Sequence, residues 1–315
     1  MDAFKNIVRE PIVSVIIPSY NSAAFLPAAI ASVLTQSYRH FEIIVVDDGS
    51  VDRTRELATS YPVKYIYQQN QGVSAARNRG VSEAIGELVV FLDADDILLP
   101  QALEIGVEAI TSHPESGFVA GSCQEIDAGG AIISESNLAS TRIANYQTLL
   151  RGEAFVPPSV LMFRKTAIKS VGGFNNRFKG AEDYDFYLRI ARQFPIYCHN
   201  QTVTYYRRHD NNASNNAIEM LAGCLEILDL NWKFVRGNRQ YERAYRAGRN
   251  YWIQLFGPYL MYQTIRYLRS RQWHRALKAL LFQLQVYPKG ISEYIFAHSL
   301  VKFRHRNFKL KTRKI

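Results

Sequence analysis

The sequence predicts an α/β protein, in which a mostly parallel sheet is flanked by helices and followed by a C-terminal α-helical extension. Two observations predict this fold class. In the first half of the chain, short apolar and β-branched runs alternate with stretches of helical spacing, as expected for a parallel sheet covered on both faces. From about residue 217 onward the pattern is helical throughout and rich in Tyr, Trp, Leu and Arg.

Four apolar runs are expected to form the strands in the first part of the sheet. They cover residues 13–17, 41–46, 63–67 and 88–92. Runs of this length and composition are typical of buried parallel strands. The first run ends at Pro18, and the fourth leads directly into an acidic cluster.

Helices are expected between these strands, because the apolar residues there recur at helical spacing. They cover residues 23–36, 52–60 and 73–85. Further along the chain, Gly129 and Gly130 predict a hairpin turn between short strands.

Three polar loops follow predicted strands, at residues 18–21, 47–50 and 93–96. In open parallel sheets, ligands bind beyond the carboxyl ends of the strands, near the point where the strand order reverses. We therefore expect these three loops to converge on one crevice, which is the candidate ligand site.

The charge of the chain is unevenly distributed. The whole sequence carries 38 Lys and Arg against 28 Asp and Glu, a formal net charge of +10. Residues 221–315 carry 19 basic and 4 acidic residues, which leaves 19 basic and 24 acidic residues in 1–220. This asymmetry predicts two domains, a sheet-containing domain at 1–215 and a basic, aromatic-rich helical region at 216–315.

The three cysteines (Cys123, Cys198 and Cys224) are widely spaced and show no CxxC pairing. This pattern favours buried thiols in a reducing compartment over a disulfide framework or a zinc site. No signal peptide is visible, and no window holds the roughly 18 apolar residues that a membrane span needs. We therefore expect a cytoplasmic protein that is not secreted, has no transmembrane span and lies at most on the cytoplasmic face of the membrane.

The acidic cluster that follows the fourth predicted strand is Asp93, Ala94, Asp95 and Asp96. Three carboxylates within four residues repel one another, so a half-buried cluster favours a cation. Mg²⁺ and Mn²⁺ take oxygen ligands and often bind one or two carboxylates together with substrate phosphates. The pattern predicts metal and nucleotide binding by Asp93 and Asp95, whereas Asp96 is expected to cap a helix that begins near Leu98. The alternative is a solvated acidic loop.

A second pair of carboxylates, Asp47 and Asp48, ends the second predicted strand. Such a carboxylate can accept a hydrogen bond from a base N–H or a ribose hydroxyl, or it can serve only the geometry of a turn. A dinucleotide site would need a GxGxxG loop after the first strand, where this sequence has Pro-Ser-Tyr-Asn at 18–21. The dinucleotide-binding interpretation therefore fails.

Other polar residues have two interpretations each. Arg77, next to Asn78 on a predicted helix, can contact a phosphate or form a salt bridge on the helix surface. Glu182 and Asp183 precede an amphipathic helix, where a carboxylate can cap the helix or act as the general base for an attacking hydroxyl. The basic run at 206–209 (Tyr-Arg-Arg-His) can supply a neutral imidazole ligand, His209, or a phosphate-binding cation, although a lone histidine is more often structural.

Together these residues resemble the family 2 glycosyltransferases of the GT-A fold. The similarity covers roughly residues 10–215, about two thirds of the chain, and the order and spacing of its motifs make it specific. The matching segments are 14–21, 36–38, 42–54, 70–80, 86–96, 172–174 and 182–183. The resemblance implies an inverting enzyme that uses a nucleotide sugar, often a UDP-sugar, and a divalent metal, Mn²⁺ or Mg²⁺.

The resemblance also implies roles for individual residues. Pro18, Tyr20 and Asp48 would cradle the nucleoside of the donor. The other residues expected at the donor site are Asn21, Asp47, Arg77, Asn78, Asp93 and Ala94.

For the chemistry, the resemblance implies that Asp95 is the closer metal ligand of the Asp93–Asp95 pair. His209 is compatible with a role as a further ligand of the metal or of the diphosphate. Asp183, beside Glu182, would be the catalytic base. It would activate the acceptor hydroxyl for a single inverting displacement at the anomeric carbon.

Processive relatives carry a QxxRW motif some tens of residues past the base. The nearest candidate here, the Arg-Gln-Trp run at 271–273, has the wrong order and lies too far downstream. We therefore expect one sugar to be transferred per encounter, to a glycan or a lipid-linked glycan acceptor in cell-envelope or exopolysaccharide assembly.

Residues 221–315 lie outside the resemblance. Their basic, aromatic pattern fits contact with an anionic membrane, packing against the catalytic domain or a second subunit in a homodimer, or nucleic-acid binding. We favour the membrane and expect no nucleic acid, because no recognised nucleic-acid module is present.

Two other classes of function use the same acidic cluster. A metal-dependent nucleotidyl or phosphoryl transferase would need a basic, glycine-rich loop after the first strand, which the sequence lacks. A non-catalytic nucleotide-binding scaffold would not need the carboxylate of Asp183.

Overall fold

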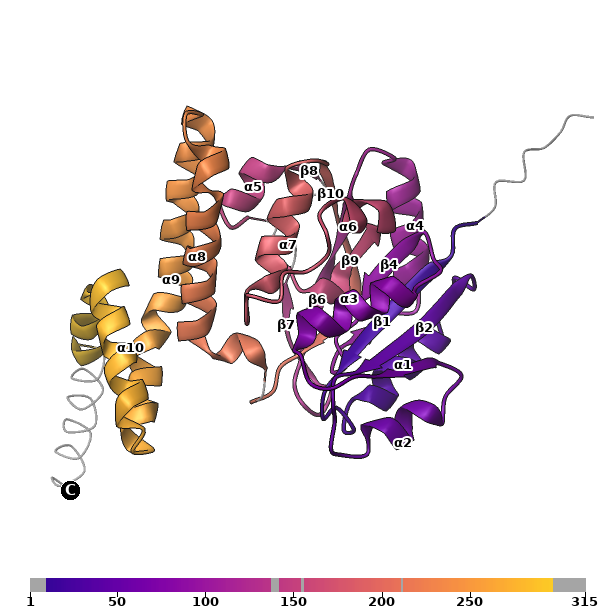
Figure 1. Cartoon of the computed structure of the whole chain (residues 1–315), viewed down its shortest axis with the longest axis horizontal. Coiled ribbons are helices and arrows are strands. Elements are labelled where there is room, and N and C mark those ends of the chain that lie inside the picture. The colour runs from indigo at the N-terminus through magenta and orange to yellow at the C-terminus, as the bar shows by residue number, and fades with distance from the viewer. Residues whose placement is uncertain (1–9, 137–141, 154–155, 211, 297–315) are drawn as a thin grey trace, which may run out of the picture. The chain divides into compact units, whose positions relative to one another are not determined.

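The computed structural model describes residues 10–136, 142–153, 156–210 and 212–296 (Figure 1). The chain divides into two compact units. The first comprises Met1–Phe178 and Glu182–Asn212, and the second comprises Lys179–Ala181 and Ala213–Ile315. The segment Lys179–Ala181 joins the helical unit although it lies far from that unit in the sequence.

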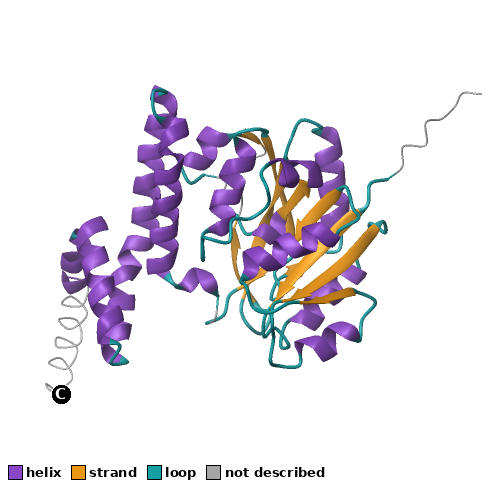
Figure 2. Ribbon diagram, in the orientation of Figure 1, coloured by secondary structure: helices purple, strands orange, loops and turns teal. Residues whose placement is uncertain are grey.

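The first unit is built on a mixed sheet flanked by helices (Figure 2), which confirms the predicted fold class. In the described part of the chain, the strand order is β3-β2-β1-β4-β9-β6-β10-β5, with β7 beside β6 and β8 beside β10. The four predicted strands are all present and pair in parallel, with β1 between β2 and β4. They are β1 (Val13–Ser19), β2 (Phe41–Asp47), β3 (Lys64–Tyr67) and β4 (Leu88–Phe91).

The second half of the sheet is mixed. Its strands are β5 (Ile97–Leu98), β6 (Phe118–Ile126), β7 (Ile132–Ser136), β8 (Arg142–Ala144), β9 (Leu161–Arg164) and β10 (Ile196–Arg207). Strand β9 runs antiparallel to both β4 and β6, whereas β6 and β10 are parallel. The predicted hairpin joins β6 to β7, and Gly130 in its turn has a φ of 95°, a conformation that favours glycine.

The three predicted helices are α1 (Leu26–Leu34), α2 (Thr54–Thr59) and α3 (Val73–Glu83), each shorter than expected. The other helices of this unit are α4 (Ala102–Ser112), α5 (Tyr146–Leu150), α6 (Lys165–Ser170), α7 (Glu182–Ala191) and the 3₁₀ turn η1 (Pro158–Val160). Helix α3 packs on β1 and β2, and α4 packs on β6, β9 and β10.

The expected cap role of Asp96 is wrong. No helix begins near Leu98, because residues 97–98 form β5 and pair with β10, and α4 begins only at Ala102. The Asp96 side chain is buried, and its carboxylate accepts hydrogen bonds from Oγ of Ser159 (2.6 Å) and from the backbone N–H of Arg207 (3.0 Å). Burial, reinforced by the neighbouring acids, raises the pKa of Asp96 well above its usual range.

A cluster of phenylalanines joins the end of β4 to helix α7. The rings of Phe174 and Phe186 stack at 4.0 Å, and both contact the ring of Phe91 edge-on, at 5.1 and 6.4 Å. All three side chains are buried. Because Phe91 precedes the acidic cluster and Phe186 lies on α7, this packing fixes the acidic N-terminus of α7 with respect to the end of β4.

The second unit is helical in its described residues, as the sequence predicts. Its helices are α8 (Ala217–Val235), α9 (Arg239–Arg269) and α10 (Trp273–Val286), preceded by the 3₁₀ turn η2 (Ala213–Asn215). Helices α8 and α9 pack together as a hairpin, and α10 packs on α9. Gly237, with a φ of 89°, makes the turn between α8 and α9 possible.

Within the described residues, every helix is too short or too polar to cross a membrane. All three cysteines are buried, as expected.

Candidate active site

The loops after β1 and β2 are joined by side-chain hydrogen bonds. The backbone N–H of Asn21 donates to Oγ of Ser50 (2.8 Å), and Oδ1 of Asn21 accepts from the N–H of Val51 (2.9 Å). Asn21 has a φ of 49°, a left-handed conformation that asparagine tolerates better than most residues. Asn21 thus brings together the first two of the three predicted loops.

Asp47 and Asp48 are buried, and both carboxylates bind groups of the protein. Asp48 accepts from the backbone N–H groups of Gln71 (2.9 Å) and Gly72 (2.7 Å) and from the side chain of Gln68 (2.7 Å). Asp47 accepts from the backbone N–H of Ser50 (2.8 Å) and the hydroxyl of Tyr65 (2.6 Å). These bonds match the turn-geometry interpretation, and they set the conformation of the loop that leads into α3.

Of the two residues expected beside them, Pro18 lies inside β1, paired with Val46 of β2. Tyr20 follows the strand, and its side chain is 53% exposed. An exposed aromatic ring at the end of a parallel strand is accessible for stacking by a planar ligand.

Arg77 is the centre of the acidic site. It lies on α3 with only 3% of its side chain exposed, so the surface salt-bridge interpretation is wrong. Its guanidinium donates to Asp93 (2.8 Å), to Asp183 (2.8 Å) and, at 3.3 Å, to Glu182. One side chain thereby joins the acidic loop after β4 to the N-terminus of α7.

The same three carboxylates govern the charge of this centre. Burial disfavours the charged guanidinium, but Asp183, Asp93 and Glu182 outweigh burial and raise the pKa of Arg77. For Asp183 the balance is opposite: burial raises its pKa to about 8, and Arg77 offsets only part of that shift. A carboxyl group with a pKa near neutrality is suited to accept a proton.

Asn78, the neighbour of Arg77, holds the loop before α7. Its side-chain amide donates to the carbonyl oxygen of Phe174 and accepts from the N–H of Phe174, both at 2.8 Å. Gly173 lies against this amide with a φ of 75°, and a Cβ there would be 2.4 Å from Oδ1 of Asn78. This contact and the positive φ explain why position 173 of the Gly-Gly-Phe segment is a glycine.

The acidic loop separates Asp93 from Asp95. Asp93 faces Arg77, whereas Oδ2 of Asp95 lies 2.8 Å from Nε2 of His209. Burial, followed by the charge of Asp93, raises the pKa of Asp95, and His209 opposes this shift. Ala94, between the two acids, is buried. The structure therefore pairs Asp95 with His209 and Asp93 with Arg77.

These contacts bear on the expected metal. Within the described residues, no group of three or more His, Cys, Asp and Glu side chains is placed to hold an ion. Asp95 and His209 do supply a carboxylate oxygen and an imidazole nitrogen at one point, and both are ligands of divalent ions. The residues fit a metal that takes its remaining ligands from a bound diphosphate.

Three residues to which the sequence assigned no individual role support the acidic loop or His209. Arg207, at the end of β10, donates from Nε to the carbonyl oxygen of Asp95 (2.9 Å), and its guanidinium lies 5.2 Å from the ring of Phe25. The Phe25 ring also stacks on His209, with centroids 5.0 Å apart. The basic run at 206–209 was the only sequence signal for Arg207, and Phe25 had the pattern of an ordinary helix residue.

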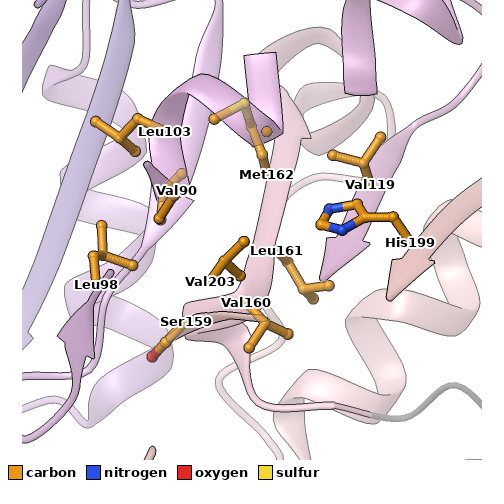
Figure 3. Close-up of a pocket in the computed structure, with 12 residues that line it drawn as sticks. Val90, Leu98, Leu103, Val119, Ser159, Val160, Leu161, Met162, His199 and Val203 are labelled. Atoms are coloured by element: carbon orange, nitrogen blue, oxygen red, sulfur yellow. The ribbon is translucent and has the colours of Figure 1, made fainter. Parts of the chain in front are cut away.

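The third of these residues is Ser159. Its hydroxyl donates to Asp96 and accepts from the backbone N–H of Asp93 (3.2 Å). Ser159 also lines an apolar cavity between α4 and the sheet, with Leu103, Met162 and His199 among its neighbours (Figure 3). The cavity has a volume of about 20 Å³, room for about one water molecule and far too small for a sugar nucleotide. It is therefore distinct from the candidate active site.

The fold and the site together define a class of protein. The solved structure of S. aureus TarS residues 1–349 in complex with UDP aligns with a TM-score of 0.66 and 19% identity, covering 88% of this chain and 81% of TarS. A mannosyltransferase from Pyrobaculum calidifontis, solved with GDP-Man and Mn²⁺, aligns with a TM-score of 0.60 and 18% identity, covering 90% and 88%. This chain has the GT-A fold of these enzymes.

The family follows from the sequence comparisons. The model of the family described as glycosyl transferase family 2 matches residues 14–172, about half of the chain. An uncharacterised glycosyltransferase of Rickettsia typhi is 30% identical over 223 residues, which cover 67% of this chain and 68% of that protein. The chain therefore belongs to glycosyl transferase family 2 and is a glycosyltransferase.

Proposed function

We propose that this glycosyltransferase inverts the anomeric centre as it moves one sugar at a time from a nucleotide sugar, most simply a UDP-sugar, to an acceptor hydroxyl. The observation that carries the proposal is the bridge made by Arg77, which holds Asp93 of the acidic loop and Asp183 of α7 on one guanidinium. A donor-side carboxylate and a candidate base are thereby fixed at neighbouring positions, as direct displacement requires.

On the donor side, the nucleoside would bind over the loops after β1 and β2. Tyr20 offers an exposed ring for the base, and Asp47 and Asp48 hold the surrounding loops through their hydrogen bonds. Solved relatives support a nucleotide donor, because TarS was crystallised with UDP and with UDP-GlcNAc. The mannosyltransferase with GDP-Man shows that the base and the sugar vary within this fold.

Asp95 and His209 would hold the divalent metal, which when bound would neutralise the charge of the departing diphosphate. The structure of the chain prepares this pair in two ways. Phe25 stacks on the imidazole, and Arg207 fixes the backbone of Asp95. Asp93 would orient the donor from its position on Arg77.

The transfer itself would need one proton acceptor. The acceptor hydroxyl oxygen forms a bond to the anomeric carbon while the bond from that carbon to the diphosphate oxygen breaks, and the hydroxyl proton goes to Asp183. Because attack and departure take place on opposite faces of the sugar, the anomeric configuration inverts. The acceptor is proposed to be a glycan or lipid-linked glycan in cell-envelope or exopolysaccharide assembly.

The test is a panel of nucleotide sugars incubated with the full chain and Mn²⁺, with release of nucleoside diphosphate as the readout. We expect turnover of at least one donor, with water taking the place of the acceptor hydroxyl, and Asp183→Asn should lower that turnover by about 10²–10⁴-fold, the usual contribution of a general base. Asp185→Asn is the matched control, because Asp185 lies on the same turn of α7 but binds Arg189 instead. If both variants kept full activity, Asp183 would not be the base.

A further inference from the structure

Helix α10 exposes an apolar stripe on one face. The stripe consists of Trp273, Leu277, Leu281 and Leu284, whose side chains are 63%, 56%, 57% and 48% exposed. Their spacing of four, four and three residues places them along one side of the helix. Ala276, Ala279 and Gln283 form a separate, buried face, and α10 packs on α9, as Figure 1 also shows. Four large apolar side chains in a row form a patch that marks an interaction surface.

Basic side chains occupy part of the remaining exposed surface of α10. His274 and Lys278 follow the stripe around the helix, Arg275 lies on the side away from it, and all three are exposed. Between residues 266 and 296 the sequence holds six Lys or Arg and a single acidic residue, Glu293. Glu293 lies beyond the end of α10, where its carboxylate accepts a hydrogen bond from the hydroxyl of Tyr287 (2.7 Å).

We propose that the α10 stripe docks on the surface of an anionic lipid bilayer. An amphipathic helix of this kind lies in the plane of the interface, with Trp and Leu side chains among the acyl chains and basic side chains at the headgroups. Each basic residue near an anionic surface adds to the attraction. The apolar interior of an anionic bilayer therefore complements the stripe, and its negative surface complements the basic side chains of α10.

The charge also argues against a second copy of the chain as the occupant. A symmetric dimer through this stripe would place two equally basic faces against each other, which costs free energy unless counter-charges are present. The proposal concerns the helical unit and does not rest on the proposed transfer reaction. If both hold, the enzyme works beside a bilayer and its acceptor is of the lipid-linked class.

The experiment uses the full chain and sedimentation with vesicles of phosphatidylcholine alone or mixed with phosphatidylglycerol. We expect binding to the mixed vesicles that weakens with added salt, and little binding to the neutral ones. Leu277→Glu/Leu281→Glu should abolish binding. The matched control is Ile85→Glu/Ile132→Glu, because these two isoleucines are equally exposed but lie in the first unit.

A second pair of variants tests the charge. Lys278→Ala should weaken binding to the mixed vesicles about fivefold, the effect expected of one basic residue near the surface. Arg55→Ala/Lys169→Ala removes two exposed basic residues of the first unit and should leave binding unchanged. Circular dichroism of each variant verifies that it is folded. Brominated lipid should quench part of the tryptophan fluorescence of the wild type, and Trp273→Phe should lose that quenching because Trp232 and Trp252 lie outside α10.

Two results would overturn the proposal. One is a wild-type chain that does not bind the mixed vesicles at low salt. The other is a wild-type dimer in sedimentation equilibrium that Leu277→Glu/Leu281→Glu converts into a monomer, because the stripe would then be a subunit interface.

Discussion

At the residue scale, one partly buried cluster contains Arg77, Asp93, Glu182 and Asp183. Because these side chains contact one another away from bulk water, the charge of each depends on the others. Four groups with one positive and three negative formal charges cannot all be ionised in a low-dielectric site without strain. The structure resolves this by burying Arg77 between the acids and by raising the pKa of Asp183 to about 8. A site of this kind is prepared to take up one proton.

That pKa makes a prediction for the pH dependence of the reaction. A general base works in its deprotonated form, so the acceptor kcat/KM should rise about tenfold per unit from about pH 6 and level off above about pH 8. The measurement is a pH profile at saturating donor and metal. Asp183→Asn should lose the rise, whereas the Asp185→Asn control should keep it. A flat wild-type profile across this range would contradict the assignment.

The contact between Asp95 and His209 makes a second prediction at this scale. If these side chains hold the metal, Asp95→Asn and His209→Asn should each raise the Mn²⁺ concentration needed for half-maximal activity by at least about 10–100-fold, the loss that removal of even an outer-shell partner causes. His113→Asn is a suitable control, because that ring binds a backbone carbonyl of its own helix and stacks on Tyr197. Binding of Mn²⁺ measured by titration, without turnover, separates metal affinity from catalysis. If both variants kept the wild-type Mn²⁺ affinity, Asp95 and His209 would not be the metal ligands.

At the element scale, the part of the site around Arg77 is formed by α3, the end of β4 and the N-terminus of α7, and contacts between these elements hold it together. Asn78 of α3 binds both polar groups of the Phe174 backbone, and Phe174 packs on Phe91 at the end of β4. The N-terminus of α7, which carries Asp183, is held by the same ring cluster through Phe186. The positions of Arg77, Asp93 and Asp183 thus follow from the packing of α3, β4 and α7.

Substitution of Gly173 tests the contribution of the two hydrogen bonds between Asn78 and Phe174 to stability. Gly173→Ala adds a Cβ that would lie 2.4 Å from Oδ1 of Asn78, in addition to the strain of a left-handed alanine. Gly172→Ala has the same φ of 75° but no heavy atom within 4 Å of the new Cβ, so it isolates the strain. We expect Gly172→Ala to lower the free energy of unfolding by about 1–2 kcal/mol. Gly173→Ala should lower it by about 1–3 kcal/mol more, because a buried hydrogen-bonded pair is disturbed. Urea denaturation measures the free energy of unfolding of both variants. Equal losses would mean that the hydrogen bonds between Asn78 and Phe174 do not contribute to stability.

At the scale of the whole molecule, chemistry and charge are divided between two units. The first unit contains the sheet and every residue of the candidate active site, whereas the strongly basic part of the chain is the helical second unit. This division follows from composition, since a parallel sheet needs apolar, β-branched strands and a basic helical unit does not. The proposed reaction belongs to the first unit and the proposed membrane contact to α10.

The sequence by itself determined the parallel strands and the helical C-terminal unit, because periodicity and β-branched runs are local properties of the chain. It also determined the family, because the motifs that carry the resemblance keep their order along the chain. Only the tertiary structure decided the partners of the polar residues. Arg77 is buried rather than exposed, Asp96 binds Ser159 and Arg207 rather than capping a helix, and Asp95 faces His209, 114 residues away. The physical reason is that burial and hydrogen bonding between distant segments depend on how the sheet and helices pack, which no local pattern records.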